Sequence, residues 1–211
     1  MTLPSPPSTT PVEAAIEGTP LAYTENDGAV AITSSIAITD VDDTNIEWAV
    51  VKITGNYATG EDVLAFVDQN GISGSWNPTN GKLSLTGSAT LAQYEAALRS
   101  VTFENTSDTP STATRTVSFT VNDGDDISNT LTRDISFTAV NDAPAFSGLD
   151  ANPTYTKRSA VTLDNDVTVT DAELSGANDF GGSTLTLVRN GGANSEDVQR
   201  RRQSRLQRRD S

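Results

Sequence analysis

The sequence predicts an all-β protein, a two-sheet antiparallel sandwich with one short helix, followed by an incomplete second module. Three observations support this class. Aromatic residues make up only 6% of the 211 residues, whereas the chain holds 15 Gly and 9 Pro, a composition typical of turn-rich β proteins. About eight short β-type runs fall within residues 12–140. A similar pattern then begins again after residue 144.

Alternating residues and turn signals mark the strands of the first module. Val117, Phe119 and Val121 alternate with polar residues, which is the period of a strand with one buried face. Two Asn-Gly pairs, at 70–71 and 80–81, lie between β-rich runs and tolerate positive φ. Each pair therefore predicts a hairpin turn.

One segment has the period of a helix rather than that of a strand. Leu91, Tyr94 and Leu98 recur at three- and four-residue spacing. Thr90 and Gln93 stand three residues apart, as in a capping box. We therefore expect one short amphipathic helix that packs over the sandwich.

The chain divides by composition into five predicted segments. The first is rich in Pro, Ser and Thr, which favours an extended, solvated leader, and the last is rich in Arg and is expected to be disordered. The segments are the leader (1–11), a sandwich module (12–140), a linker (141–144), a partial second module (145–195) and the Arg-rich tail (196–211).

The second module is predicted from an internal repeat. The runs YTENDGAVAITSSIAITDVDD at 23–43 and YTKRSAVTLDNDVTVTDAEL at 155–174 share a Tyr-Thr start, an alternating strand and a Thr-Asp turn followed by a second acid. Their offset of about 132 residues matches one module length. Because three strands of a sandwich expose an apolar face and an open edge, we expect the second copy to be loosely ordered.

Charge and composition exclude several function classes. The chain has 28 acidic and 14 basic residues, and six of the basic ones are Arg within the last twelve positions. The acidic remainder attracts cations and repels nucleic acid and anionic membranes. The lack of Cys and His excludes thiolate chemistry, the usual zinc sites and His-dependent triads. Oxygen ligands remain, and these suit Ca²⁺. No secretory signal is visible, and no apolar run approaches the roughly 20 residues of a membrane span.

Three short motifs follow one another along the chain: YTENDG at 23–28, TDVDD at 39–43 and VNDAP at 140–144. Their order resembles that of the cadherin-like repeats found in tandem in very large bacterial surface and RTX-type secreted adhesins, over residues 12–144 and weakly over 145–195. The resemblance implies a Greek-key sandwich of the cadherin or Ig-like type, outside the cell or at its surface. It also implies a non-enzymatic spacer or adhesion repeat whose partners are neighbouring repeats of the same chain.

In cadherin-like repeats, Ca²⁺ is bound at the junction between modules. The resemblance implies a ligand from the first module, Glu25, two from the linker, Asn141 and Asp142, and two from the second module, Asp171 and Glu173. Ca²⁺ takes about six to eight oxygen ligands and tolerates irregular geometry. Without the ion these acids would repel one another, so we expect a flexible joint in its absence.

A second set of candidate ligands, Asp40 and Asp42 with Asp43 nearby, would lie at the opposite pole of the first module. The resemblance is incomplete, because the acidic motif that cadherins carry in mid-domain is not evident. Three alternatives stay open: one ligand is missing, Glu95 substitutes for it, or Asp123 does.

Other interpretations of these residues stay open. Asp and Asn also start turns and cap helices in β proteins, which is the interpretation favoured for residues 123–126. Trp48 and Trp76 are either core residues or a sugar-stacking pair. The alternative function is therefore a β-sandwich module that binds a carbohydrate or another ligand, such as a cell-surface polysaccharide. A hydrolase using paired acids ranks last, because no such pair lies in an apolar pattern.

Overall fold

The computed structural model describes residues 13–149, 154, 156, 158–177, 180, 181 and 183–186. The predicted leader, the Arg-rich tail and Tyr155 lie outside these residues. The chain divides into two compact units, Met1–Gly176 and Ala177–Ser211. In the second unit the Ser183 amide donates to the Phe180 carbonyl at 3.0 Å. The division into a module, a linker and a partial second module stays a prediction.

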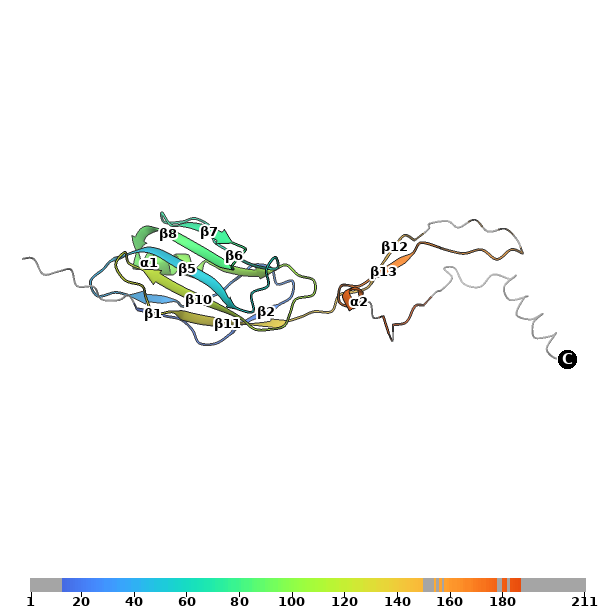
Figure 1. Cartoon of the computed structure of the whole chain (residues 1–211), viewed down its shortest axis with the longest axis horizontal. Helices are drawn as coiled ribbons and strands as arrows, with labels where there is room; N and C mark the ends of the chain where they lie inside the picture. Colours follow the sequence, from blue (N-terminus) through green and yellow to red (C-terminus); the bar gives the residue numbers. More distant parts are fainter. Residues whose placement is uncertain are drawn as a thin grey trace, which may run out of the picture. The chain divides into compact units, whose positions relative to one another are not determined.

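The larger layer of the sandwich is a six-stranded sheet, in which every neighbouring pair is antiparallel except β2 with β11 (Figure 1). In spatial order its strands are β2 (Leu21–Thr24), β11 (Leu131–Thr138), β10 (Arg115–Asn122), β5 (Asn45–Gly55), β8 (Lys82–Thr90) and β7 (Ser73–Asn77). β2, the first of these strands in the sequence, therefore lies beside β11, the last of them, and the two strands run in the same direction.

The second layer is smaller, and in the sequence its strands fall between strands of the first layer. Its three strands, all antiparallel, are β3 (Val30–Ala31), β9 (Thr102–Asn105) and β6 (Asp62–Ala65). A separate antiparallel pair joins β1 (Glu13–Ala15) and β4 (Ala37–Thr39). The predicted all-β, antiparallel Greek-key sandwich is confirmed, and the parallel β2–β11 pair is its one departure among the described strands.

The core lies between the two layers. In β10 the predicted inward face is confirmed, since Val117, Phe119 and Val121 are at most 1% exposed. Phe103 of β9 and Leu64 of β6 come from the second layer and are equally buried. Each such side chain contributes about 1.5–3 kcal/mol of transfer free energy, so the alternating pattern is the main source of stability.

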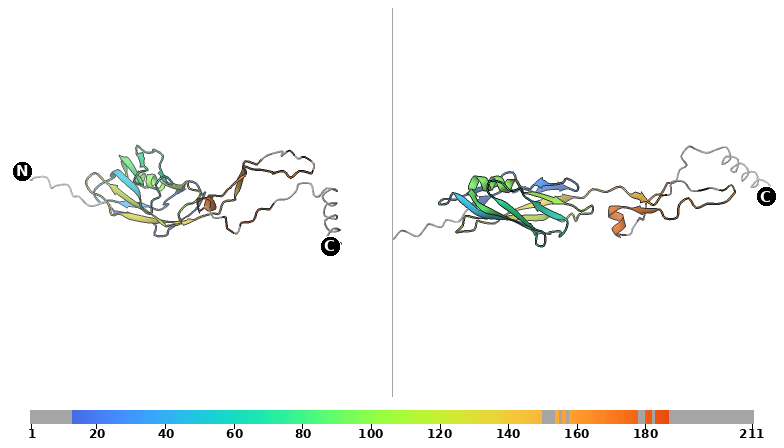
Figure 2. Two further views of the ribbon diagram at one scale, coloured as in Figure 1. Left: turned by 45° about the vertical axis from the view of Figure 1, so that its right-hand side comes forward. Right: turned by 90° about the horizontal axis from the view of Figure 1, so that it is seen from above.

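The predicted helix forms as α1 (Leu91–Arg99). The Thr90 Oγ1 accepts from the Gln93 amide at 3.3 Å, and the Gln93 Oε1 accepts from the Thr90 amide at 2.9 Å, which completes the capping box. Tyr94 and Leu98 point into the core. The views of Figure 2 show α1 beside β5 and β8, with which it is in contact.

Both predicted Asn-Gly turns are present. Asn70 and Gly71 both have positive φ, at 53° and 77°, between the bridged residues 69 and 72. The second turn, at 80–81, connects β7 to β8. Gly87 of β8 has a φ of 132°, and a Cβ at this position would collide with the carbonyl oxygen of Gly71. Only glycine therefore fits where the turn at 70–71 lies against β8.

A polar clamp fastens the segment after β1 to the sheet. Glu17 accepts hydrogen bonds from Thr33 Oγ1, the Ser34 amide and Ser35 Oγ at 2.5 to 2.9 Å, and pairs with Arg133 at 2.6 Å. Burial raises the pKa of Glu17, but the hydrogen bonds from these three neighbours outweigh it and lower the pKa to about 2. The clamp therefore requires the ionised carboxylate.

Beyond β11 the chain forms a two-stranded ribbon of β12 (Ala145–Ser147) and β13 (Thr168–Thr170), followed by α2 (Ala172–Ala177). The sequence pattern did not predict α2. Phe146 and Val169 pair across the ribbon and are 50% and 40% exposed, so it presents apolar side chains to solvent. Neither helix of the described residues is long and apolar enough to cross a bilayer.

Candidate metal centre

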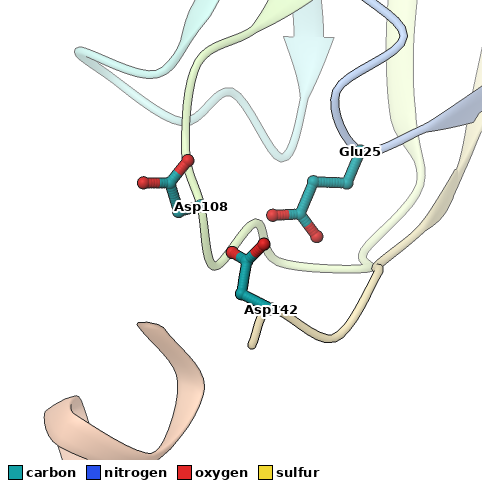
Figure 3. Close-up of side chains that lie close together, drawn as sticks. All are labelled: Glu25, Asp108 and Asp142. Atoms are coloured by element: carbon teal, nitrogen blue, oxygen red, sulfur yellow. The ribbon is translucent and has the colours of Figure 1, made fainter. Parts of the chain in front are cut away.

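Three carboxylates from distant parts of the sequence converge at one end of the sandwich (Figure 3). Glu25 follows β2, Asp108 lies in the loop between β9 and β10, and Asp142 follows β11. One carboxylate oxygen of each lies within 4.8 Å of the other two. Because β2 and β11 are parallel neighbours, their carboxyl ends emerge at the same edge, which brings Glu25 and Asp142 together. We call Glu25, Asp108 and Asp142 the acid triad.

Glu25 is the most buried member of the acid triad, with 5% of its surface exposed. Its amide donates to the Thr138 carbonyl at 2.9 Å, and its Oε2 accepts from the Val140 amide at 2.8 Å. Its Oε1 is buried and has no hydrogen-bond partner within the described part of the chain. A buried carboxylate oxygen without a donor is costly, and its chemistry fits a hard cation such as Ca²⁺.

The segment after β13 contributes a second buried oxygen next to Asp142. The Asp142 amide donates to Glu173 Oε1 at 3.1 Å. Glu173 Oε2 is buried and lacks a hydrogen-bond partner among the described residues. Both predicted ligands, one from the linker and one from the partial second module, are therefore in contact.

The other two predicted junction ligands are near the acid triad but have different contacts. Asp171 is 7% exposed and its Oδ1 accepts from the Leu174 amide at 2.9 Å, so it caps the start of α2. It lines an open hollow together with Asp108 and Asp142. Asn141 is exposed, and its side-chain amide donates to the Asp142 carbonyl at 2.6 Å.

Sequence reasoning missed Asp108. Neither proposed substitute for the mid-domain acid belongs to the triad, since Glu95 accepts from the Ile38 amide at 2.9 Å and pairs with Arg99. Asp123 accepts from two amides of its own turn. The local signal at Asp108 is only an acid in a Ser- and Thr-rich loop, which is typical of any turn.

A second acidic group, at Asp40, Asp42 and Asp43, also has one oxygen from each residue within 4.8 Å of the others. Asp40 Oδ1 accepts from the amides of Asp42 and Asp43 at 3.0 and 2.9 Å, which is the geometry of an ordinary Asx turn. Some loss of solvation and the charges of nearby acids, Asp123 and Asp40 first among them, raise the pKa of the exposed Asp43. This pole therefore carries concentrated negative charge.

The two Trp residues do not form one aromatic platform. Trp48 pairs with Thr86 across β5 and β8, whereas Trp76 pairs with Leu83 across β7 and β8. Positions 83 and 86 of β8 point to opposite faces, so the two indoles do as well. Both are half-buried, and Trp76 packs against the core and edge-on to Tyr57, with ring centroids 6.3 Å apart.

Comparisons with known proteins give one informative result. No protein-family model matches the chain, and no solved structure matches it. Among curated proteins, the chain is similar to Halomucin of Haloquadratum walsbyi, with 33% identity over 108 residues. The match covers 48% of this chain, and the chain spans only 1% of the length of Halomucin. The relationship to cadherin-like repeats stays a prediction.

Proposed function

We propose that the chain is a non-enzymatic module of a large cell-surface or secreted protein, in which Ca²⁺ stiffens the joint after the first sandwich. The similarity to Halomucin supports the coarser part, a module of a surface protein. The finer part rests on one observation, the buried Glu25 Oε1 that lies beside Asp108 and Asp142 without a hydrogen bond.

The electrostatics of the acid triad favour a bound cation. Two unit charges 4.8 Å apart, the upper limit for these oxygens, repel by about 0.9 kcal/mol in bulk water and by about 3.5 kcal/mol at an effective dielectric constant of 20. A divalent ion bound among the three carboxylates attracts each of them, and these attractions outweigh the three mutual repulsions. Ca²⁺ suits the donor set, because it accepts carboxylate oxygens in irregular arrangements.

The contacts of the triad explain how an ion would stiffen the joint. Residues 139–144 contain no strand or helix. Glu25 already holds the Val140 amide, and Glu173 holds the Asp142 amide. An ion held by the acid triad, with Glu173 Oε2 as a further donor, would tie β2, the Asp108 loop, the joint and α2 to one point. Neighbouring repeats of the same chain are the proposed partners of this rigid array.

The expected stabilisation is modest. Extracellular modules bind Ca²⁺ with dissociation constants of about 10⁻⁴ to 10⁻³ M. At about 10 mM Ca²⁺ this range corresponds to about 1.4–2.7 kcal/mol of added folding free energy. Such a site is filled outside cells and is poorly suited to respond to micromolar signals.

Calorimetric titration with Ca²⁺ tests the proposal, comparing the native chain with a Glu25→Ala/Asp142→Ala double variant. We expect heat of binding from the native chain and loss of the triad component in the variant. An Asp134→Asn variant is the control, because Asp134 is an exposed acid of β11 outside the triad. Unchanged Ca²⁺ uptake by the double variant would refute the assignment.

Limited proteolysis provides an independent readout of stiffening. We expect Ca²⁺ to protect residues 139–146 in the native chain and not in the double variant. The same cleavage pattern with and without Ca²⁺ would contradict a mechanical role.

A carbohydrate platform built on Trp48 and Trp76 is not proposed, because the two indoles lie on opposite faces of the sheet.

A further inference from the structure

A buried ion pair links the two sheets. The side chains of Arg115 on β10 and Asp62 on β6 are both 0% exposed, and Arg115 Nε lies 3.0 Å from Asp62 Oδ2. Burying two charges costs several kcal/mol per ion, and replacing such pairs with apolar residues is often neutral or stabilising. Stability alone is therefore a weak explanation for this pair, and its other contacts indicate a different role.

The first of these contacts closes the loop that carries Asp108. Arg115 Nη1 donates to the carbonyls of Ser111 and Ala113, both at 2.7 Å. The planar guanidinium bonds Asp62 and the two carbonyls at once. The distal half of the Asp108 loop is thereby fixed to the buried pair.

The start of the same loop is fixed to the same pair through Asn105. The Asn105 side-chain amide donates to Asp62 Oδ1 at 2.7 Å, while its Oδ1 accepts from the Ser107 amide at 3.0 Å. Asn105 is only 7% exposed. Both ends of the segment that presents Asp108 therefore depend on one internal anchor.

The anchor also reaches the two strands that carry the other triad members. Tyr23 stands two residues before Glu25. Its hydroxyl accepts a hydrogen bond from the backbone N–H of Asn105 at 3.0 Å and donates one to the backbone carbonyl of Asn105 at 3.3 Å. The Arg115 guanidinium lies 4.3 Å from the ring centroid of Phe137 on β11. Phe137 pairs with Tyr23 in the β2–β11 register, with ring centroids 5.0 Å apart.

We propose that Arg115 and Asp62, together with the Tyr23 hydroxyl that joins them through Asn105, are positioning residues for the acid triad, and that they set its affinity for the cation without touching it. This inference rests on the proposed function. Outer partners that orient metal ligands typically change affinity by about 10–100-fold when mutated. A lysine at position 115 keeps the positive charge. Its single ammonium group lacks the planar, several-donor guanidinium that bonds Asp62 and the two carbonyls together.

Calorimetric Ca²⁺ titration of the full chain tests this role, together with thermal unfolding in EDTA. Two variants are compared with the native chain. Arg115→Lys keeps the positive charge, and Tyr23→Phe keeps the aromatic ring and removes only the hydroxyl. Arg133→Lys is the matched control, because Arg133 also pairs with an acid, Glu17, but its contacts lie outside the triad segments. We expect the dissociation constant to rise about tenfold for Arg115→Lys, to rise less for Tyr23→Phe, and to stay unchanged for Arg133→Lys.

The outcomes separate a positioning role from a structural one. If Arg115→Lys and Tyr23→Phe lower the unfolding temperature but bind Ca²⁺ as tightly as the native chain, the positioning role is overturned while the proposed function stands. If Arg115→Lys does not fold, the dissociation constant of Tyr23→Phe decides. Absence of Ca²⁺ uptake by the native chain overturns the proposed function, and this inference with it.

Discussion

Replacing Asp108 with Asn should stabilise the ion-free protein and weaken its response to Ca²⁺. The substitution removes the repulsion of Asp108 by Glu25 and by Asp142, whose oxygens lie within 4.8 Å. Each repulsion amounts to about 0.9 kcal/mol at the dielectric constant of water, and the lower value applies because Asp108 is exposed. We therefore expect a gain of about 1–2 kcal/mol in EDTA at low salt. In about 10 mM Ca²⁺ the native chain gains about 1.4–2.7 kcal/mol, so the stability advantage of Asp108→Asn should shrink or reverse, because the variant lacks one carboxylate of the site.

Urea unfolding measures both halves of this prediction. The gain in EDTA should shrink in about 1 M NaCl, where the Debye length falls to roughly 3 Å. Asp134→Asn is the control, since Asp134 is exposed and its Oδ1 bonds to Thr116 Oγ1 at 2.8 Å, a contact that Asn preserves. Destabilisation of Asp108→Asn in EDTA, or a full Ca²⁺ response in that variant, would refute the reasoning.

Three further predictions concern the framework of the fold. Because the pKa of Glu17 lies at about 2 in the folded state against 4.5 ordinarily, Glu17 should contribute up to about 3 kcal/mol above pH 4.5. The stability difference between the native chain and Glu17→Gln should shrink as the pH falls from 4.5 and be lost as the pH passes below about 2; a difference independent of pH would contradict this. Thr90→Ala should cost about 1 kcal/mol in urea unfolding by removing the capping box with Gln93, and no loss would mean that the cap is redundant. Gly87→Ala should cost more than about 1–3 kcal/mol, because its methyl group meets the Gly71 carbonyl; a thermal midpoint equal to that of the native chain would argue against this close approach.

Much of the fold follows from short stretches of residues. The inward positions of β10, the Asn-Gly turns and the capping box at Thr90 each depend on neighbours only a few residues away, and all are confirmed. The six-residue α2 was missed because it is too short to show a helical period. The parallel β2–β11 pair was missed because no local signal states which strands become neighbours.

The candidate site shows the same division more sharply. The resemblance to cadherin-like repeats named Glu25, Asp142 and Glu173 as candidate ligands, and their role as ligands stays a prediction. In the structure Glu25 lies beside Asp142, and Asp142 is in contact with Glu173. It could not select Asp108, because the relevance of that acid depends on where its loop is held. Arg115 and Asn105 bond the two ends of the loop, and both are bonded to Asp62 on β6, a strand distant in the sequence. The hydrophobic period, the turn residues and the local charge each depend on residues a few positions apart, so they can be recognised in the sequence. Convergence of side chains depends on strand order and on buried long-range contacts, and these exist only once the sandwich has folded.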